Sequence, residues 1–331
     1  MSELVSIVCT TYNEEKLIAK TLESFLAQQL NGMQSEILIV DGMSTDDTRK
    51  IVNEYSRKYT NVKLIDNTER KNPFGRNKGV TKSKGNYIAL LGAHTIYDSD
   101  YVKICIEELK RTNSIGVSGK VLTAFEKITP ESELCELVLS SKFGVSGESF
   151  RTVSEGYTSM INYPVFKREV FEEVGLYDTA LHRNQDNDFN SRILAKGYKL
   201  YNTWKTECRY YPSETLSGTL AYSYRNGFWN AKTIIKNPEI LMVHHYVPFI
   251  FVMTLLVLLV TGIITSFYNV LLPLQIFLLV LLLHISVGYS FSFRIIKYRT
   301  LKNILVLPFL FFVFHFSYGW GTLRGFFTKK I

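Results

Sequence analysis

The sequence predicts an α/β fold of the doubly wound type, followed by transmembrane helices at the C-terminus. Over residues 5–65, short apolar runs rich in β-branched residues alternate with segments of helical periodicity, in the order of a βαβαβ unit. Three later stretches, residues 247–267, 270–293 and 304–323, contain no Asp, Glu, Lys or Arg, and each can cross a hydrocarbon layer of about 30 Å. We therefore expect a Rossmann-like mixed sheet with flanking helices, plus a membrane domain.

The first expected strand covers residues 5–10, and a polar loop and a helix follow it. In the helix, Leu17, Leu22 and Phe25 recur at helical spacing. Asn13 stands in the preceding loop, where it can cap the helix.

The second expected strand, residues 37–40, has four consecutive apolar residues, which is typical of a parallel strand buried on both faces. Asp41 follows at its carboxyl end, where open α/β sheets bind their ligands. Right-handed crossovers bring this end beside the loop after the first strand, so Glu14 and Asp41 could both face one ligand. The alternative is a turn without chemistry, in which residues 44–47 only cap a helix over about residues 48–59.

Residues 72–80 and 87–94 contain the next polar signals. Arg76 and Lys78 lie between two glycines at an expected helix start, a place that attracts phosphate, although a solvated basic turn fits the pattern equally well. A fourth strand, residues 87–91, runs into Gly92-Ala93-His94. After a further apolar run at residues 115–119, the chain up to residue 151 has no clear periodicity and is left unassigned.

Two blocks complete the soluble part. Residues 163–178 predict a strand and a short helix that ends at Gly175. A polar loop then leads into a helix in which Phe189, Ile193 and Leu194 point inward. Asp186 and Asp188 stand at its start, and each taken singly is more typical of a helix cap than of a catalytic base.

The membrane-proximal segments carry basic and aromatic residues. Residues 216–235 mix both kinds on one expected helix, which suits the headgroup zone, and an ordinary amphipathic helix packed on the domain is the alternative. Four cations between residues 294 and 302 predict a cytoplasmic loop, and hence a cytoplasmic soluble domain. A crossing third span would leave Arg324, Lys329 and Lys330 outside, so a re-entrant or interfacial segment is also open.

Charge, cysteine usage and the N-terminus narrow the class of protein. The formal charge of +8 accompanies no basic, aromatic-studded nucleic-acid motif, so we expect membrane lipids rather than nucleic acid as the partner. The N-terminus lacks the pattern of a cleaved signal peptide. The four cysteines have no metal-type spacing, and we interpret them as reduced packing residues.

Five ordered blocks carry a resemblance to a known family. They read VSIVCTTYNEE, ILIVDGMSTDDT, GRNKGV, YPVFKREVFEEVGLYD and NQDNDFNSRI. In this order and separation they resemble family 2 glycosyltransferases with the GT-A fold, over about residues 2–229. The C-terminal spans and the segment SYRNGFW are similar to bacterial membrane-anchored exopolysaccharide glycosyltransferases.

The resemblance implies a domain organisation. Residues 1–214 would form a cytoplasmic GT-A domain, residues 215–240 an interfacial amphipathic helix and linker, and residues 241–331 a membrane domain with two or three spans. The protein would then be a multi-pass protein of the cell (inner) membrane. Nothing in the sequence indicates its oligomeric state.

The resemblance also implies roles for individual residues. Asp186 would be the general base that takes a proton from the acceptor hydroxyl as that oxygen attacks the anomeric carbon, with inversion. Arg225 and Trp229 would line the acceptor side. The residues expected to bind the donor are Thr10, Tyr12, Glu14, Asp41 and Arg76.

The sequence departs from the family pattern at the expected DxD motif, which reads Gly92-Ala93-His94. His94 falls on the metal-ligand position, and a divalent cation, Mn²⁺ or Mg²⁺, is expected there. Because imidazole binds Mg²⁺ less well than Mn²⁺, the preference between the two ions should differ from that of a DxD site. Gly42 also replaces the second of two acidic residues that usually follow the second strand.

The expected activity is inverting transfer of a sugar from a nucleotide sugar, expected to be a UDP-sugar, to a lipid-linked saccharide. One alternative is transfer to polyprenyl phosphate, an acceptor that is already ionised and needs no general base. The other is a non-catalytic membrane-bound scaffold that retains the fold.

Overall fold

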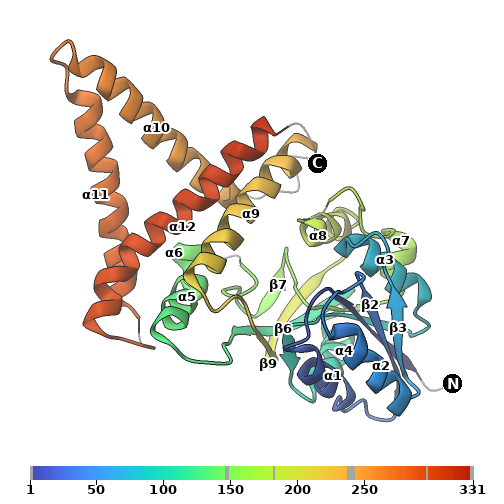
Figure 1. Ribbon diagram of the computed structural model, residues 1–331. Helices are drawn as coiled ribbons and strands as arrows, with labels where there is room; N and C mark the ends of the chain where they lie inside the picture. The colour runs from blue at the N-terminus through green and yellow to red at the C-terminus, as the bar shows by residue number, and fades with distance from the viewer. Residues whose placement is uncertain (1–2, 146–148, 182, 237–242, 296, 329–331) are drawn as a thin grey trace. The chain divides into compact units, whose positions relative to one another are not determined.

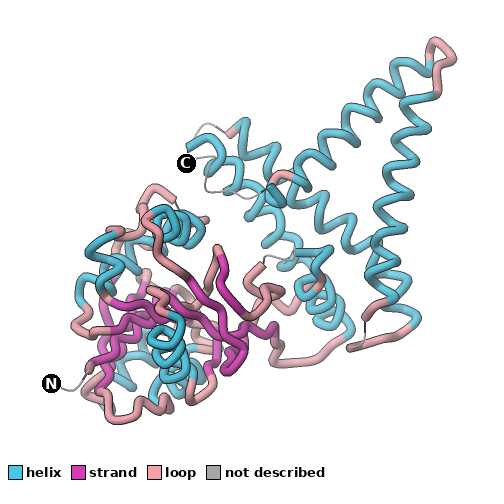
Figure 2. The backbone as a smooth tube through the Cα atoms, turned by 180° about the vertical axis from the view of Figure 1, so that it is seen from behind, coloured by secondary structure: helices cyan, strands magenta, loops and turns pink. Residues whose placement is uncertain are grey.

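The computed structural model describes residues 3–145, 149–181, 183–236, 243–295 and 297–328 (Figure 1). The chain divides into two compact units. The sheet unit consists of Met1–Ala124 and Val153–Tyr211, and the helical unit consists of Phe125–Thr152 and Pro212–Ile331. Figure 2 shows that the strands of the described chain lie in the sheet unit.

The sheet unit contains one nine-stranded mixed sheet. Its strands are β1 (Leu4–Thr11), β2 (Gln34–Asp41), β3 (Val62–Asp66), β4 (Tyr87–Gly92), β5 (Thr95–Tyr97), β6 (Gly116–Thr123), β7 (Gly156–Thr158), β8 (Val165–Lys167) and β9 (Leu200–Tyr210). They are arranged in the order β3-β2-β1-β4-β8-β6-β9-β5, and β7 pairs with β9. The strands β1 to β4 are parallel, which confirms the predicted βαβαβ unit and brings the carboxyl ends of these strands to one edge.

Helices cover the sheet on both faces because the strands alternate buried side chains between the two faces. The helices of this unit are α1 (Ile18–Leu26), α2 (Thr48–Lys58), α3 (Asn72–Lys82), α4 (Tyr101–Thr112), α7 (Glu169–Glu173) and α8 (Gln185–Ala195). One continuous apolar core joins Val8, Leu38 and Leu90 of the sheet to residues of α3, α7 and α8. Gly79 allows α3 to lie directly on β1, since a methyl group there would collide with Val8.

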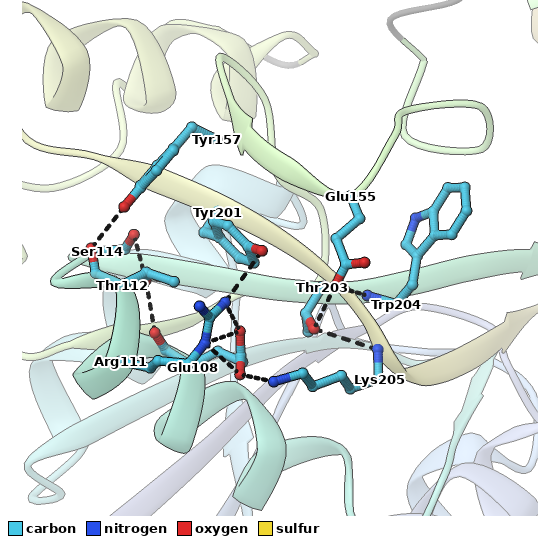
Figure 3. Close-up of polar contacts among 10 residues, drawn as sticks. All are labelled: Glu108, Arg111, Thr112, Ser114, Glu155, Tyr157, Tyr201, Thr203, Trp204 and Lys205. Carbon is cyan, nitrogen blue, oxygen red and sulfur yellow. Dashed lines mark hydrogen bonds and ion pairs between the residues drawn. The ribbon is translucent and has the colours of Figure 1, made fainter.

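A polar network fastens α4 to β9 (Figure 3). The Glu108 carboxylate is 3% exposed and accepts hydrogen bonds from Arg111 Nε, at 3.0 Å, and from Lys205 Nζ, at 2.7 Å. Arg111 also donates to the hydroxyl of Tyr201, at 3.2 Å. These hydrogen bonds join the helix to a strand about ninety residues later in the chain.

The helical unit contains the unassigned stretch of the sequence as well as the C-terminal helices. Its elements are α5 (Pro130–Ser140), α6 (Lys142–Val145), α9 (Leu216–Lys236), the 3₁₀-helix η2 (Val243–His245), α10 (Val247–Ser266), α11 (Leu272–Phe293) and α12 (Leu301–Phe327). Residues 125–152, expected in the N-terminal domain, belong to this unit because α5 packs its apolar face on α12. Among the residues that the structure describes, three helical segments are long and apolar enough to cross a membrane: Val243–Ser266, which contains α10, then α11 and α12.

The helix expected at the membrane interface, α9, packs lengthwise on α12 through small residues. A methyl group added at Gly227 would collide with the backbone of Tyr318, and one added at Gly321 would collide with the backbone of Tyr224. Such close backbone approach needs small side chains on both helices. The linker expected at residues 237–240 lies outside the described residues.

Candidate functional site

The loops after β1 and β2 are joined by hydrogen bonds. Asn13, at φ 53°, donates its N–H to Ser44 Oγ at 2.9 Å, and its Oδ1 accepts the N–H of Thr45 at 2.9 Å. The N–H of Glu15 donates to Asp46 Oδ2 at 3.1 Å. The predicted helix cap by Asn13 is therefore wrong, because its side chain holds the second loop and α1 begins only at Ile18. The meeting of these two loops at one sheet edge is as predicted.

Asp41 lies at the end of β2 with its side chain completely buried. It accepts the N–H and the hydroxyl of Ser44, and it pairs with Arg49 Nη1 at 2.8 Å. Arg49 also pairs with Asp66, at the end of β3, at 2.8 Å. Ser44 therefore serves Asp41 rather than the helix, whereas Asp46 Oδ1 accepts the N–H of Thr48 as expected for a helix start. Contact between Asp41 and the nucleotide-sugar donor stays a prediction.

Glu14 and His94 form the first of two polar pairs at this edge. Glu14 Oε1 lies 3.0 Å from His94 Nδ1. Since a carboxylate accepts hydrogen bonds, Nδ1 carries the proton, and in the neutral ring Nε2 keeps its lone pair. The Glu14 backbone is fixed by its N–H, which donates to Thr48 Oγ1 at 2.7 Å. The His94 ring also contacts Tyr210 edge-on, at 5.1 Å between ring centroids.

The donor set for a metal ion at this edge is small. No group of three or more His, Cys, Asp or Glu side chains in the described ranges could hold a metal ion. His94 Nε2 can act as one ligand, and the Glu14 hydrogen bond to the opposite ring nitrogen is the usual support of a metal-binding histidine. A cation here fits only if most of its ligands come from a diphosphate and water, as is common for Mg²⁺-type sites.

Arg76 and Asp186 form the second polar pair. Arg76 Nη1 donates to Asp186 Oδ1, and the two side chains are 13% and 30% exposed. The guanidinium also lies over the ring of Tyr177, 5.1 Å from its centroid. Arg76 lies one turn after Asn72, the first residue of α3. Its positive charge is paired with the Asp186 carboxylate, and it also faces any phosphate bound at the start of this helix.

The start of α8 differs from the prediction in its details. The residue before the helix is Asn184, with φ 62°, and neither aspartate caps the helix. Asp186 pairs with Arg76, while Asp188 is buried and pairs with Arg192 at 2.8 Å. Of the three apolar side chains predicted inward, two are buried, but Leu194 is 36% exposed.

Both pairs lie near the carboxyl end of β1. Burial raises the pKa of the Cys9 thiol, Glu14 raises it further, and Arg76 lowers it, so both charges act on this one buried group. Thr10 Oγ1 donates to Asn72 Oδ1 at 3.0 Å, which ties the strand end to the start of α3. Tyr12 is 49% exposed on the first loop.

The remaining predicted residues belong to the helical unit. Arg225 and Trp229 lie on α9, where Arg225 is exposed. All four cysteines are buried and free, which confirms their interpretation as packing residues. Asn72 and Tyr177 have no local signal in the sequence, because their partners lie 62 and about 100 positions away.

Comparison with known proteins adds the family. The model of the family "Glycosyl transferase family 2" matches residues 6–175. A glucuronosyltransferase of Methanococcus voltae, named as acting on dolichyl N-acetyl-alpha-D-glucosaminyl phosphate, is 27% identical over 97% of this chain and 96% of its own. Succinoglycan biosynthesis protein ExoA of Rhizobium meliloti is 28% identical over 71% of each chain.

A solved structure has a similar fold. The mannosyltransferase PcManGT from Pyrobaculum calidifontis, solved in complex with GDP-Man and Mn²⁺, aligns with a TM-score of 0.63 at 14% identity. The alignment covers 100% of this chain and 89% of the other. The predicted GT-A fold, a mixed sheet with flanking helices and apolar C-terminal helices, is confirmed.

Proposed function

Because the chain belongs to glycosyl transferase family 2 and is a glycosyltransferase, we propose that it transfers a sugar from a nucleotide donor to a lipid-linked saccharide. The observation that carries this proposal is the placement of Asp186 and His94 near the carboxyl end of β1, the edge at which α/β sheets bind nucleotides. The full-length relative from Methanococcus voltae supports the acceptor, since its name specifies a sugar on a dolichyl phosphate.

In the proposed reaction Asp186 is the general base. Its carboxylate takes the proton of the acceptor hydroxyl while that oxygen forms the new bond to the anomeric carbon. The bond from this carbon to the nucleoside diphosphate breaks on the opposite side, so the configuration inverts. Arg76 is a positioning residue, because its ion pair fixes the direction in which the carboxylate points.

The donor would bind across the two interlocked loops. Tyr12 is exposed there to stack on a base, and Thr10, Glu14 and Asp41 line the same strand ends. We propose a UDP-sugar as the donor, and the solved complex with GDP-Man shows that the fold also accommodates a guanine nucleotide. A divalent cation, if bound at His94 Nε2, would neutralise the charge that develops on the departing diphosphate.

We place the sheet unit on the cytoplasmic side of the cell membrane. Arg294, Lys297, Arg299 and Lys302 follow α11, and cationic loops of this kind stay in the cytoplasm. Arg225 and Trp229 would contact the lipid-linked acceptor.

The test is transfer in membranes that contain the full chain. Membranes are incubated with a panel of radiolabelled nucleotide sugars, with and without lipid extract, and the lipid product is analysed. Label on a lipid that already carries a sugar supports the proposal and identifies the donor. Label on polyprenyl phosphate itself would favour the alternative acceptor, and no label from any donor would favour the scaffold.

A further inference from the structure

The two helices α10 and α11 form an antiparallel hairpin. Only residues 267–271 connect them, and Gly262 of α10 lies against Leu274 of α11 near this connection. With 20 and 22 residues and a rise of 1.5 Å per residue, each is about 30 Å long and matches the hydrocarbon layer. When both helices cross, the start of α10 and the end of α11 lie at the same membrane face.

The third apolar helix, α12, contacts both of these ends. Its second half reaches the first turns of α10, because a methyl group at Gly319 would collide with the carbonyl of Pro248. On the side of α11, Gly288 lies on Pro308, in the first half of α12. About one turn further from the end of α11, His284 Nε2 lies 3.0 Å from Nδ1 of His315, near the middle of α12. Figure 1 shows α12 passing from the end of α11 to the start of α10.

The spacing of these contacts is too long for a helix along the membrane normal. Pro308 and Gly319 are separated by about 16 Å along the helix axis at the usual rise. If α12 stood upright, the start of α10 and the last turns of α11 would differ in depth by about this distance, which is half of the hydrocarbon thickness. The two ends reach the same face only if α12 lies across the open end of the hairpin.

The partners on the other side of α12 are charged helices. The helix α5 packs Leu134 and Val138 on Leu307 and Phe311 of α12. Near this contact Glu136 pairs with Lys297 at 2.6 Å and Glu133 accepts from Asn303 at 3.4 Å. These contacts hold α5, with its carboxylates, at the membrane face where α12 begins.

The helix α9 also argues against an upright α12, at the other end of that helix. It runs beside the second half of α12, and Lys232 Nζ donates to the carbonyl of Thr328. Arg225 and Lys236 are exposed on α9. An upright α12 would therefore place α9, with its cations, beside the distal half of the bilayer.

We infer that α12 does not cross the membrane and lies along its face, at the boundary of headgroups and hydrocarbon, between the α10–α11 hairpin and the charged helices α5 and α9. A stripe of exposed apolar and aromatic side chains along α12 faces the lipid, with a cation at each end. The stripe consists of Lys302, Leu305, Phe309, Val313, Trp320, Arg324 and Phe327. Aromatic and basic side chains of this kind favour the interface. The chain then crosses the bilayer twice, and α12 ends on the side of the sheet unit.

Sidedness distinguishes two crossings from three. An epitope tag is placed after Ile331, and in a second protein within the α10–α11 connection after Asn269, so that no side chain is replaced. Antibody access is then compared in intact and permeabilised cells. The C-terminal tag should be reached only after permeabilisation, like the sheet unit, and the tag at residue 269 should be reached in intact cells. Access to both tags in intact cells would overturn the inference.

Depth gives a second measurement that does not depend on the tags. Single nitroxide labels are attached at Val313, in the middle of α12, and at Val257, in the middle of α10. Both side chains are exposed. The native cysteines, all buried, are replaced by alanine in a background whose sugar transfer is checked first. Oxygen should relax the label at residue 257 several times more strongly than the label at residue 313. Equally strong relaxation by oxygen at both positions would contradict an interfacial α12.

Discussion

The ion pair between Arg76 and Asp186 makes the proposed base testable at a single residue. Asp186→Asn keeps the size of the side chain and its place in the first turn of α8 but cannot accept the proton. We expect sugar transfer to fall about 10²- to 10⁴-fold, the usual cost of removing a general base. Donor affinity, measured by calorimetry in the same preparation, should change little.

Asp188 is the matched control for this substitution. It lies two residues later on the same helix, but it is buried and paired with Arg192. Asp188→Asn should lower the thermal stability and leave the transfer rate of the folded protein near normal. Near-normal transfer by Asp186→Asn would instead favour a phosphate acceptor, and lost donor binding would mean that Asp186 shapes the pocket.

The hydrogen bond between Glu14 and His94 leads to a prediction about metal ions. Glu14→Gln removes the carboxylate that fixes the proton on Nδ1 and leaves Nε2 free as a ligand. We expect the Mn²⁺ concentration for half-maximal activity to rise about 10- to 100-fold. His94→Ala should abolish the preference for Mn²⁺ over Mg²⁺.

Glu15→Gln is the control, because Glu15 belongs to the same loop and its carboxylate accepts the backbone N–H of Asp47 in the second loop. Its metal dependence should equal that of the parent protein. Unchanged metal dependence in both Glu14→Gln and His94→Ala would show that this pair is structural.

At the residue scale, the sequence predicted positions better than partners. Asp41, His94 and Asp186 stand at the strand ends and helix start where the pattern predicted them. The partner of Asp186 is 110 positions away, and no local spacing connects the two. The same limit explains Asn13, whose capping pattern is common but whose side chain is used by another loop.

At the scale of elements, Glu108 fastens α4 to β9 and should make stability depend on pH. Hydrogen bonds from Arg111, opposed by burial, lower the pKa of Glu108 below its ordinary value of 4.5. A carboxyl group with a lowered pKa stabilises the folded state fully above the unfolded-state value, and this contribution is lost as the pH falls through the folded-state value. Glu108→Gln should cost about 1–3 kcal/mol at pH 7.

The measurement is thermal unfolding in detergent at several pH values. The melting temperature of Glu108→Gln should lie several degrees below that of the parent at pH 7, and the gap should narrow as the pH falls below 4.5 and the parent loses the charge. Glu107→Gln, at the exposed neighbouring position, should show no gap. A gap that is independent of pH would mean that packing, rather than charge, holds α4.

The sequence pattern misses a helix whose apolar residues do not follow a single helical stripe. The helix α5 was not predicted, because its apolar residues Leu134, Leu137, Val138 and Leu139 cover more than one stripe. A usable signal was present in Thr129-Pro130, since Thr129 caps the helix and proline is favoured in its first turn. The strands β1, β2 and β4 were predicted because each is buried on both faces.

At the scale of the whole molecule, the chain should be an integral membrane protein. The full-length protein should sediment with membranes and resist carbonate extraction, because α10 and α11 present apolar side chains over their whole lengths. A freely soluble full-length protein would contradict this prediction.

Truncation tests how the elements of the helical unit depend on each other. A chain that ends at Ile235 lacks α12, so Leu134 and Val138 of α5 lose Leu307 and Phe311, and Gly227 of α9 loses its partner. It should no longer resist carbonate, but it should aggregate without detergent, since α5 then exposes its apolar face. Replacing Leu134 and Val138 by serine in the truncated chain should restore solubility, as measured by size-exclusion chromatography. The same replacements in the full-length chain should destabilise it, because they bury unsatisfied hydroxyls against α12. A truncated chain that is soluble without these replacements would show that α5 does not need α12 to cover its apolar face.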